Sequence, residues 1–401
     1  MDSKKNVVLL IPSLKRGGAE RVVSRLSKIL ANDFNLKVVI FDSREIDYEC
    51  SCEVIDLGEA SSGKSVLSKF IKSLSRIIKY YRFKKKNNVD ITYSFGNSAN
   101  IVNVFSGWRD KKVTSLRGYG NIKYSNNSLS SFIISKVAKI TNKNADLIIS
   151  VSQLIKETVN KEYSIDESKI EVIYNGYDIN EIRSQAEEPI SVEIKNWMKD
   201  KFVFISMGSY REEKGYQHLI RSFSEVNKNY KNTGLLIVGK GNPKIEKDIK
   251  NLIRDLGIED KVYLAGFQKN PYSLLSNSNS YVLSSLSEGF PNALVEAMAC
   301  GLPVISTDCN SGPKEILAEI KNLSHVTKQI NIEEYGILVE PVNANKDNIN
   351  NVERALTESM IVMLENEEIR NRIKNKVNKR AKEFSYELWR SKHVQAFDNL
   401  I

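Results

Sequence analysis

The chain has 401 residues, of which 41% are hydrophobic and 27% are charged, and its formal net charge at pH 7 is +10. This composition excludes a disordered chain, and this length predicts two domains, or three, rather than one hydrophobic core. No window approaches the ~18 uninterrupted apolar residues of a membrane-spanning helix, and the apolar run near the N-terminus is too short for a signal-peptide core, so we expect a cytoplasmic protein that is at most peripheral on a membrane.

Short β-branched or aliphatic runs alternate with stretches of helical periodicity along the whole chain. This alternation is typical of βαβ units, which build parallel sheets with helices on both faces. Ligands of such sheets bind at the carboxyl ends of the strands, so the loops after strands are the places to look for chemistry. The predicted strands are Val7–Ile11, Lys37–Phe41, Asp90–Tyr93, Val113–Ser115, Leu147–Val151, Glu171–Ile173, Phe202–Met207, Gly234–Val238, Lys261–Leu264, Ser280–Leu283, Val304–Ser306 and Gly336–Val339.

The pattern breaks between residues 175 and 200, where the sequence NGYD is a turn signal and the following polar segment contains Pro189. We interpret this segment as a linker between two doubly wound domains of similar size. The chain from about Val352 onwards is helical by pattern, and its last predicted helix is Tyr386–Leu400. The predicted domains are residues 1–180, residues 190–380 and a final helix over residues 384–401.

The loop after the first predicted strand reads PSLKRGGAE and opens a helix at about Gly18. Gly17 and Gly18 permit close backbone approach, and the N–H groups of a helix start favour an anion. Lys15 and Arg16 add positive charge at the same place. A plain tight turn is an equally good interpretation, because two glycines are weak evidence.

The positive excess lies in the first 180 residues, which hold 29 Lys and Arg against 19 Asp and Glu, whereas the remaining residues hold 30 of each. Residues 60–89 hold nine basic residues, no acid, and apolar residues at helical spacing. Such a helix could rest on an anionic membrane through Lys69, Lys72, Arg76 and Lys79; a packed helix with a solvated lysine face is the alternative. Nucleic acid is not an expected partner, because the chain has no zinc-finger spacing and no RNA-binding aromatic motif.

The first loop of the second half reads GSYREEKG over residues 208–215. Gly208 at the strand end and Lys214 near the next helix start suit a diphosphate held by backbone N–H groups and an ammonium, with Arg211 as the second choice. The alternative is that these side chains are solvated turn residues, which is the more common role of a lysine or arginine in a loop. The next loop, GKGNP over residues 239–243, is half of a nucleotide-binding fingerprint and lacks its third glycine.

The stretch SLSEGFPNALVEAMACGLPVIST places Glu288 before a predicted helix that spans about Asn292 to Ala299, and Glu296 inside it. Proline is tolerated near a first helical turn, as at Pro291. If an anion bound at this helix start, the two carboxylates would flank it, and a carboxylate can pair with the vicinal hydroxyls of a ribose. Spacing alone slightly favours the alternative of one acid placed by the helix dipole and one exposed helical glutamate.

The four cysteines, Cys50, Cys52, Cys300 and Cys309, match none of the usual zinc patterns, and the three histidines lie far apart in the chain. We therefore expect a reduced protein without a structural metal.

The run EGFPNALVE over residues 288–296, followed by AMACGLPVI, resembles the signature of retaining glycosyltransferases of family 4, which have the GT-B fold. The GGAE sequence ending at residue 20, the NGYD turn, residues 208–215 and the terminal aromatic helix agree in order and spacing, so the resemblance spans nearly the whole chain. It implies two doubly wound Rossmann-like α/β domains facing across a cleft, with a C-terminal helix that returns towards the N-terminal domain. It also implies a nucleotide-sugar bound mainly by the C-terminal domain and an acceptor bound by the N-terminal one.

The resemblance implies roles for matching residues. Glu296 would hold the ribose hydroxyls, Glu288 would contact the donor sugar near its reacting end, and Lys214 and the Gly17–Gly18 loop would contact the diphosphate. The nucleoside diphosphate would leave with the help of fixed positive charge rather than a metal, by a front-side displacement that needs no protein nucleophile. The implied donor-binding residues are Gly17, Gly18, Gly208, Ser209, Arg211, Lys214, Gly289, Phe290, Pro291, Asn292, Ala293, Leu294 and Glu296, and the implied catalytic residues are Glu288, Lys214 and Arg117.

Two positions depart from the family pattern. Many members carry arginine directly after the glycine of the second loop, where this chain has Ser209, and Arg211 is the candidate substitute. Many also carry a histidine after the strand that corresponds to Val113–Ser115, and the N-terminal half of this chain has none. Arg117 stands at about that place and is a hypothetical contact of the donor sugar or phosphate; unchanged turnover of Arg117→Ala would rule this role out.

Residues 307–316 resemble a subgroup that often transfers galactose, GalNAc or related sugars from UDP donors in bacterial polysaccharide assembly. We therefore expect a hexosyltransferase that needs no cofactor and acts on a glycan or on a lipid-diphosphate-linked acceptor. A UDP-sugar epimerase of similar fold is one alternative, and it would consume the donor without forming a glycoside. A non-catalytic sugar-nucleotide-binding subunit is another, although Glu288, Glu296 and Lys214 are all present.

Overall fold

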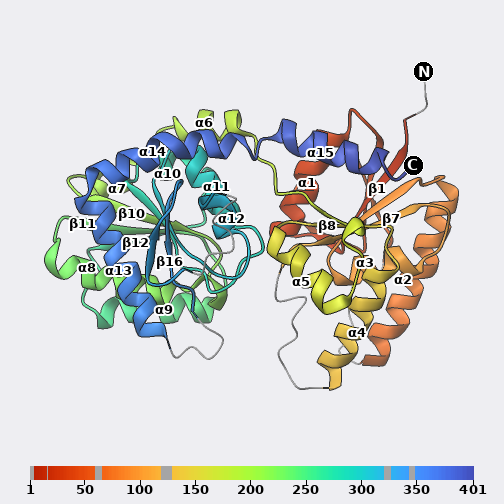
Figure 1. Ribbon diagram of the computed structural model, residues 1–401, viewed down its shortest axis with the longest axis horizontal. Helices are drawn as coiled ribbons and strands as arrows, with labels where there is room; N and C mark the ends of the chain where they lie inside the picture. Colours follow the sequence, from red (N-terminus) through yellow and green to blue (C-terminus); the bar gives the residue numbers. More distant parts are fainter. Residues whose placement is uncertain (1–3, 16, 59–65, 119–128, 320–326, 343–347) are drawn as a thin grey trace. The chain divides into compact units, whose positions relative to one another are not determined.

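The computed structural model contains two compact units, one made of Met1–Gly176 with Tyr386–Ile401 and the other of Tyr177–Ser385. The structure describes residues 4–15, 17–58, 66–118, 129–319, 327–342 and 348–401, and all of their side chains except those of residues 66–70 and 129–132. Arg16 and the side chain of Lys69 therefore lie outside the described residues. Each unit is a Rossmann-like layer of mainly parallel strands between layers of helices, as predicted (Figure 1).

The first unit is built on a seven-stranded sheet in the order β5-β3-β1-β6-β7-β8-β9, in which all neighbours are parallel. Two further short strands, β2 and β4, pair with each other. The strands are β1 (Asn6–Leu10), β2 (Ser13–Leu14), β3 (Asn35–Ile40), β4 (Asp42–Ile46), β5 (Glu53–Asp56), β6 (Ile91–Phe95), β7 (Lys111–Leu116), β8 (Leu147–Ser150) and β9 (Ile170–Val172).

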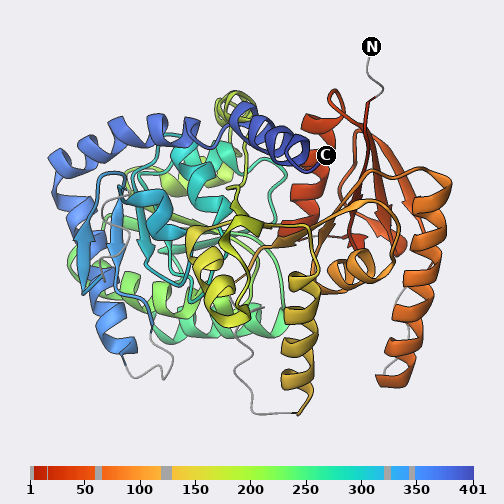
Figure 2. The ribbon, with the colours of Figure 1, turned by 45° about the vertical axis from the view of Figure 1, so that its right-hand side comes forward.

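Helices cover both faces of this sheet. One face packs against the first and last helices of the chain, and on the other three helices lie side by side in the order α2, α3, α4 (Figures 1 and 2). The helices of this unit are α1 (Gly18–Leu30), α2 (Val66–Lys86), α3 (Asn97–Phe105), α4 (Leu129–Lys143), α5 (Gln153–Tyr163) and α15 (Tyr386–Asp398).

The central strand β1 shows why the predicted strands read as continuous apolar runs. Val7 and Leu9 enter the core beneath α1 and α15, whereas Val8 and Leu10 enter the core beneath α2 and α3. A strand covered on both faces needs apolar side chains at every position rather than at alternate ones. All twelve predicted strands are present, with each end within two residues of its predicted position.

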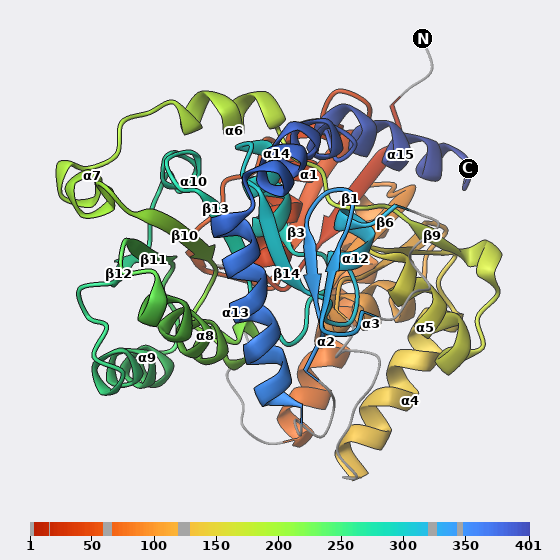
Figure 3. The same cartoon turned by 60° about the vertical axis from the view of Figure 1, so that its left-hand side comes forward.

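The second unit has a seven-stranded sheet in the order β12-β11-β10-β13-β14-β16-β15, parallel except for the edge pair β15–β16. The strands are β10 (Phe202–Met207), β11 (Thr233–Val238), β12 (Val262–Gly266), β13 (Ser280–Leu283), β14 (Val304–Thr307), β15 (Ile330–Ile332) and β16 (Ile337–Val339). The helices, several of which are seen from another side in Figure 3, are α6 (Ile179–Ala186), α7 (Val192–Met198), α8 (Tyr216–Asn229), α9 (Pro243–Asp255), α10 (Tyr272–Ser276), α11 (Asn292–Ala299), α12 (Pro313–Leu317), α13 (Ile349–Glu365) and α14 (Glu367–Lys382).

The segment predicted to be a linker is instead helical. It forms α6 and α7, and α6 packs against α10 and α11 within the second unit. Both helices begin at a polar cap: the Asp178 carboxylate accepts a hydrogen bond from the Glu181 N–H, and the Ser191 hydroxyl accepts one from the Ile194 N–H. The polar composition that suggested a linker therefore includes the N-caps of two short helices.

A buried ion pair fixes α2 to the sheet of the first unit. Lys84 Nζ lies 2.7 Å from Asp110 Oδ2, and both side chains are fully buried. Thr92 on β6 donates to the same carboxylate oxygen at 2.7 Å, and the Asn103 carbonyl accepts from Lys84 at 3.1 Å. Burial of the ammonium lowers the pKa of Lys84 to about 8, against the opposing effect of Asp110. Lys84 thus belongs to the interior and not to the cationic surface of the helix.

The last helix brings a histidine into the core of the first unit. His393 is 1% exposed and packs against the rings of Tyr93, Trp389 and Phe397. Burial lowers the pKa of His393 to about 4, so the ring is neutral at physiological pH.

We predict that His393 makes the fold sensitive to acid. The unfolded chain binds a proton at His393 near the ordinary pKa of 6.5, and the folded chain does so only near 4, so stability falls as pH drops from 6.5 towards 4. The loss approaches about 3 kcal/mol at the end of this window. Denaturant unfolding of the wild type and His393→Leu across this range should give a shallower pH dependence for the variant. Equal slopes would contradict the prediction.

Candidate functional site

Three loops of the second unit follow β10, β13 and β14, which are neighbours in the sheet, so the loops meet at one edge. They span residues 208–215, 284–291 and 308–312. In a parallel sheet this is the edge at which ligands bind. The loops contain Lys214 and Glu288, the two residues of this unit that the sequence implied to be catalytic.

Lys214 and Glu288 are paired directly. Lys214 Nζ lies 2.6 Å from Glu288 Oε1, with 22% and 12% of the two side chains exposed. The Ser285 hydroxyl donates to the same carboxylate oxygen at 2.7 Å. A charge-assisted bond at this distance holds both groups in fixed positions, with the ammonium at the rim of the sheet. The Glu288 carboxylate is therefore fixed by an ion pair and a hydrogen bond, rather than placed only by the dipole of α11.

Backbone contacts bring the first two loops together. The Ser284 hydroxyl donates to the Lys214 carbonyl at 2.9 Å, and the Leu286 N–H donates to the Glu213 carbonyl at 2.7 Å. Gly215 adopts φ +62°, and a Cβ on it would overlap the Ser284 carbonyl oxygen. Position 215 therefore requires glycine both for its backbone conformation and for the close approach of the loops.

The third loop holds the backbone next to Glu288. Ser311 Oγ lies 2.7 Å from the Glu288 carbonyl and 2.9 Å from the Gly289 carbonyl, so its proton is shared between them. Gly312 follows at φ +86°, where a Cβ would lie 2.7 Å from Pro291 Cδ. Ser311 and Gly312 were not predicted, because single Ser and Gly residues in a loop carry no spacing signal.

The start of α11 presents backbone rather than side chains. Phe290 is 5% exposed and packs edge-on against Phe384, with ring centroids 5.4 Å apart, so only its backbone is available to a ligand. Leu294 is fully buried. Asn292 accepts a hydrogen bond from the Tyr177 hydroxyl at 2.6 Å, and Ala293 is half-buried. An anion at this helix start would meet N–H groups held in place by these contacts.

Glu296 is buried, with 1% of its surface exposed. The Tyr272 hydroxyl lies 3.5 Å from its Oε1 atom. The alternative of an exposed helical glutamate is therefore excluded, and a carboxylate this deep must be hydrogen-bonded. Burial, reinforced by the charge of Glu296, raises the pKa of Cys300 to about 12, so this neighbouring thiol is not a nucleophile at neutral pH.

A hollow of about 430 Å³ lies at the ends of β11 and β12. Gly239, on its wall, adopts φ +150° and touches the Gly208 carbonyl so closely that a Cβ would overlap it. Gly208 itself lies close to Lys214, because a Cβ on Gly208 would be 3.2 Å from Lys214 Cε. Ser209 in the same loop is half-buried and Arg211 is exposed. The hollow is lined by Tyr210, Gly239, Lys240, Glu246, Lys250, Leu264, Ala265, Gly266 and Phe267.

The glycine loop of the first unit contains acids as well as cations. Helix α1 begins at Gly18, as predicted, after Gly17 in an extended conformation. The Glu20 carboxylate packs so closely on Gly17 that a Cβ there would overlap it. Lys15 Nζ lies 3.1 Å from a carboxylate oxygen of Glu45. These carboxylates offset part of the positive charge of this loop, which the sequence suggested as an anion-binding site.

The remaining predicted site residues of the first unit contact that unit itself. Arg117 follows β7 and donates to the side-chain oxygen of Asn175. On α2, the Arg76 guanidinium lies 4.6 Å from the centre of the Phe41 ring, and Lys79 donates to the Leu57 carbonyl at 3.2 Å. Lys72 is half-buried. The described part of the chain contains no group of three side chains placed to hold a metal ion.

Two family models match the chain. "Glycosyl transferases group 1" matches residues 187–380, and "Glycosyltransferase Family 4" matches residues 16–181. Together they cover both units, and the first includes Lys214, Glu288 and Glu296.

The chain is also similar to curated proteins. It is 38% identical over 266 residues to an uncharacterized glycosyltransferase of Methanocaldococcus jannaschii, a match that spans 65% of each chain. It is 29% identical over 380 residues, or 94% of each chain, to the Campylobacter jejuni N-acetylgalactosamine-N,N'-diacetylbacillosaminyl-diphospho-undecaprenol 4-alpha-N-acetylgalactosaminyltransferase.

Among solved structures, the fold is similar to that of Anabaena HepE in complex with UDP. The TM-score is 0.76 over 98% of this chain and 100% of that one, at 18% sequence identity. This likeness shows the GT-B fold.

We predict that Gly215→Ala disrupts the joined loops, and Gly257→Ala is the matched control. Gly257 has φ +64° with open space around it, so its substitution adds only the backbone strain that both variants share, about 1 kcal/mol. Gly215→Ala adds the overlap with Ser284 and should cost at least about 2 kcal/mol more in the free energy of unfolding. Chemical denaturation of both variants measures the difference. Equal losses would show that the contact at Ser284 is unimportant.

Proposed function

Because this chain belongs to glycosyltransferase family 4 and has its GT-B fold, we propose that it transfers a hexose or N-acetylhexosamine, with retention, from a UDP-sugar to a glycan or lipid-linked acceptor in bacterial polysaccharide or glycoprotein assembly. The observation that carries the proposal is the held pair Lys214–Glu288 beside the start of α11, at the ligand-binding edge of the sheet. The pair puts one fixed cation and one fixed acid within reach of a single bound molecule.

In this mechanism the donor diphosphate lies between Lys214 and the backbone N–H groups at the start of α11. The bond between sugar C1 and the diphosphate oxygen breaks, and the acceptor oxygen forms its bond to C1 on the same face of the sugar. The acceptor proton passes to the departing diphosphate oxygen. Lys214 and the N–H groups stabilise the negative charge that develops there, and Glu288 contacts the sugar. No protein nucleophile is required.

The remaining implied residues take supporting roles. Glu296 holds the ribose hydroxyls, and Arg117 contacts the sugar or phosphate in place of the histidine that many members carry. Gly208, Ser209 and Arg211 border the diphosphate. The hollow next to Gly208 has the size of a small ligand pocket, and we propose that it receives the nucleobase. No metal or cofactor takes part in the proposed reaction.

The named ligands of similar proteins support the finer choices. UDP is the ligand named for HepE, which favours a UDP-sugar donor. The Campylobacter jejuni relative is named for an acceptor joined to diphospho-undecaprenol and for a 4-alpha product. A lipid-diphosphate-linked acceptor would place this protein at the cytoplasmic face of a membrane, and an α-linked product is the outcome of retention from an α-linked donor.

The proposal predicts selective stabilisation by one nucleotide class. A ligand that binds only the folded protein raises its stability by about 2.7 kcal/mol when present at 100 times its dissociation constant. Thermal unfolding with UDP, GDP, ADP and their sugars should show the largest rise with UDP and UDP-sugars. A rise with none of them would overturn the donor assignment. Consumption of the UDP-sugar without glycoside formation would favour the epimerase instead.

We predict that Glu288→Gln separates diphosphate binding from turnover. Removing the carboxylate charge 2.6 Å from Lys214 leaves the ammonium free to act on phosphate, so UDP affinity should rise by up to about tenfold while turnover falls. Glu212→Gln, an exposed acid in the same loop, is the control and should change neither quantity. Calorimetric titration with UDP and an assay of released UDP give the two measurements. A parallel loss of both would show that Glu288 supports the fold of the loop rather than the sugar.

A further inference from the structure

Helix α2 exposes a stripe of large apolar side chains. Ile71, Leu74, Ile78 and Tyr81 are 58%, 50%, 47% and 40% exposed, and their spacing places them on one side of the helix. Arg82 and Lys85, both exposed, continue the same side by following Ile78 and Tyr81 at four positions. Two of the cations predicted to touch a membrane, Arg76 and Lys79, point elsewhere, because they contact Phe41 and Leu57. The exposed side of α2 is therefore apolar with cations among the apolar residues.

Helix α4 repeats this pattern. Ile133 and Ile140 are 52% and 42% exposed, and Lys136 and Lys143 lie on the same side of the helix, three positions after each isoleucine. The short helix α3 lies between α2 and α4, and its last residue, Phe105, is 45% exposed (Figure 2). We call the exposed residues Ile71, Leu74, Ile78, Tyr81, Arg82, Lys85, Phe105, Ile133, Lys136, Ile140 and Lys143 the α2–α4 face.

The charge of these helices has one sign. Helix α2 has eight Lys and Arg residues, α4 has three, and none of α2, α3 and α4 contains Asp or Glu. An exposed apolar surface with long cationic side chains suits the boundary of an anionic membrane, since the apolar groups enter the headgroup region and the cations reach the phosphates. A folded protein partner would need acidic groups and an apolar patch shaped to two separate helices, whereas an anionic membrane surface supplies charge and apolar groups without a matched shape. No helix in the described ranges is long and apolar enough to span a membrane.

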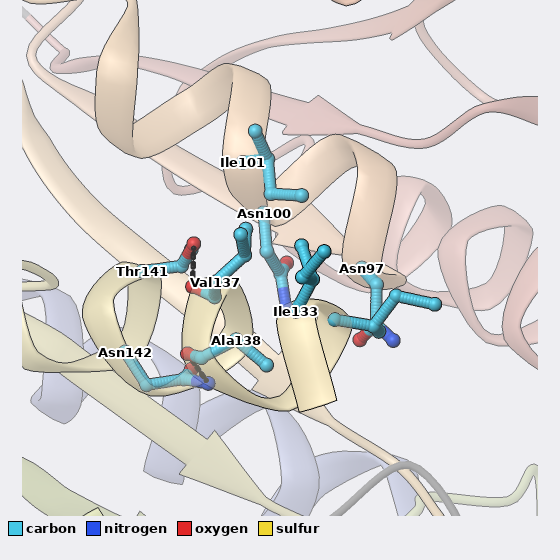
Figure 4. A pocket seen from close by; sticks show the side chains of 9 residues that line it. Asn97, Asn100, Ile101, Ile133, Val137, Ala138, Thr141 and Asn142 are labelled. Carbon is cyan, nitrogen blue, oxygen red and sulfur yellow. Dashed lines mark hydrogen bonds between the residues drawn. The ribbon is translucent and has the colours of Figure 1, made fainter. Parts of the chain in front are cut away.

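A hollow of about 130 Å³ opens between α3 and α4 (Figure 4). Ile101, Ile133, Ile134, Val137 and Ala138 line it together with four polar residues. Two of the polar side chains are already bonded inside the protein, because Asn100 accepts from Ser94 and Asn142 accepts from Thr114. The hollow therefore offers mainly methyl groups, which suit a segment of a hydrocarbon chain.

We propose that the α2–α4 face docks on an anionic phospholipid membrane and that the hollow between α3 and α4 receives part of a lipid chain. Helices α2 and α4 each follow the end of a strand, so both begin at the carboxyl edge of the sheet. Gly17 and Arg117 lie at the same edge. Docking would thus bring a lipid-linked acceptor to the edge at which the first unit binds it. This last step rests on the proposed function, whereas docking itself does not.

Vesicle sedimentation tests the proposal with the full chain. The wild type should bind vesicles of phosphatidylcholine with phosphatidylglycerol and bind pure phosphatidylcholine at least about tenfold more weakly. Lys85→Glu with Lys136→Glu should reduce binding to the anionic vesicles by about tenfold or more. Lys374→Glu with Lys379→Glu, exposed cations on α14, makes the same change in net charge and should leave binding as in the wild type. Equal losses in the two double variants would overturn the docking face.

The apolar part has its own test. Leu74→Ser with Ile133→Ser changes only exposed side chains, so folding should persist, and circular dichroism checks this. High salt should remove a smaller share of bound wild type than of this variant, because salt screens charges but not apolar contacts. If salt released the wild type and this variant from vesicles to the same extent, the proposed apolar contact with the membrane would be contradicted. The thermal shift caused by UDP, measured on the same proteins, reports on the donor site separately, so failure of docking and failure of the proposed function give different results.

Discussion

The ion pair between Lys214 and Glu288 determines the arrangement of the site in the second unit. Two partly buried charges are costly to hold away from water unless they are paired and hydrogen-bonded. Here Lys214 and Glu288 pair with each other, and the Ser285 hydroxyl donates a further hydrogen bond to Glu288. The pair therefore fixes the loop after β10 against the loop after β13. Gly215 then lets the backbones of these two loops come close together, and Ser311 holds the loop after β14 against the backbone at Glu288 and Gly289. The result is a frame in which the protein's own contacts hold the charges of Lys214 and Glu288, and charges held in this way can stabilise a transition state without rearrangement.

Most of the fold could be predicted because its strands are buried on both faces. Runs such as Phe202–Met207 show this condition directly in the sequence, and there the predicted ends match the structure. The strands that were missed are short or lie at edges, such as β4, whose residues are largely exposed and include Arg44 and Glu45. A strand with one solvent-exposed face has no continuous apolar run by which the sequence could identify it. The helices α6 and α7 were missed for a related reason, since each is short and shows more of its polar caps than of an apolar stripe.

The sequence indicated candidate site residues but not the contacts that they make within the protein. Lys214 and Glu288 stand 74 positions apart, and nothing in the sequence indicates that they are bonded to each other rather than to a ligand. Ser285 and Ser311 were missed because a serine is recognised as functional only through what it touches. The burial of Glu296 was also hidden, since a single acid on an eight-residue helix gives no clear periodicity. The family signature identified positions, and only the folded chain gives the partners of each side chain.

The absence of histidine from the N-terminal half did not mean its absence from the first unit. Helix α15 returns His393 to that unit from the far end of the chain, beside Tyr93 of β6. Burial and the surrounding rings keep this imidazole neutral and out of reach, so it is a core residue rather than a replacement for the histidine that many family members carry. Arg117, which is partly exposed at the end of β7, is the better candidate for that place. An arginine there would keep its charge at every physiological pH, so it could contact a phosphate or a sugar hydroxyl but could not act as a proton acceptor. In the reaction that we propose, Arg117 would therefore not take the acceptor proton, which is why that mechanism passes the proton to the departing diphosphate oxygen.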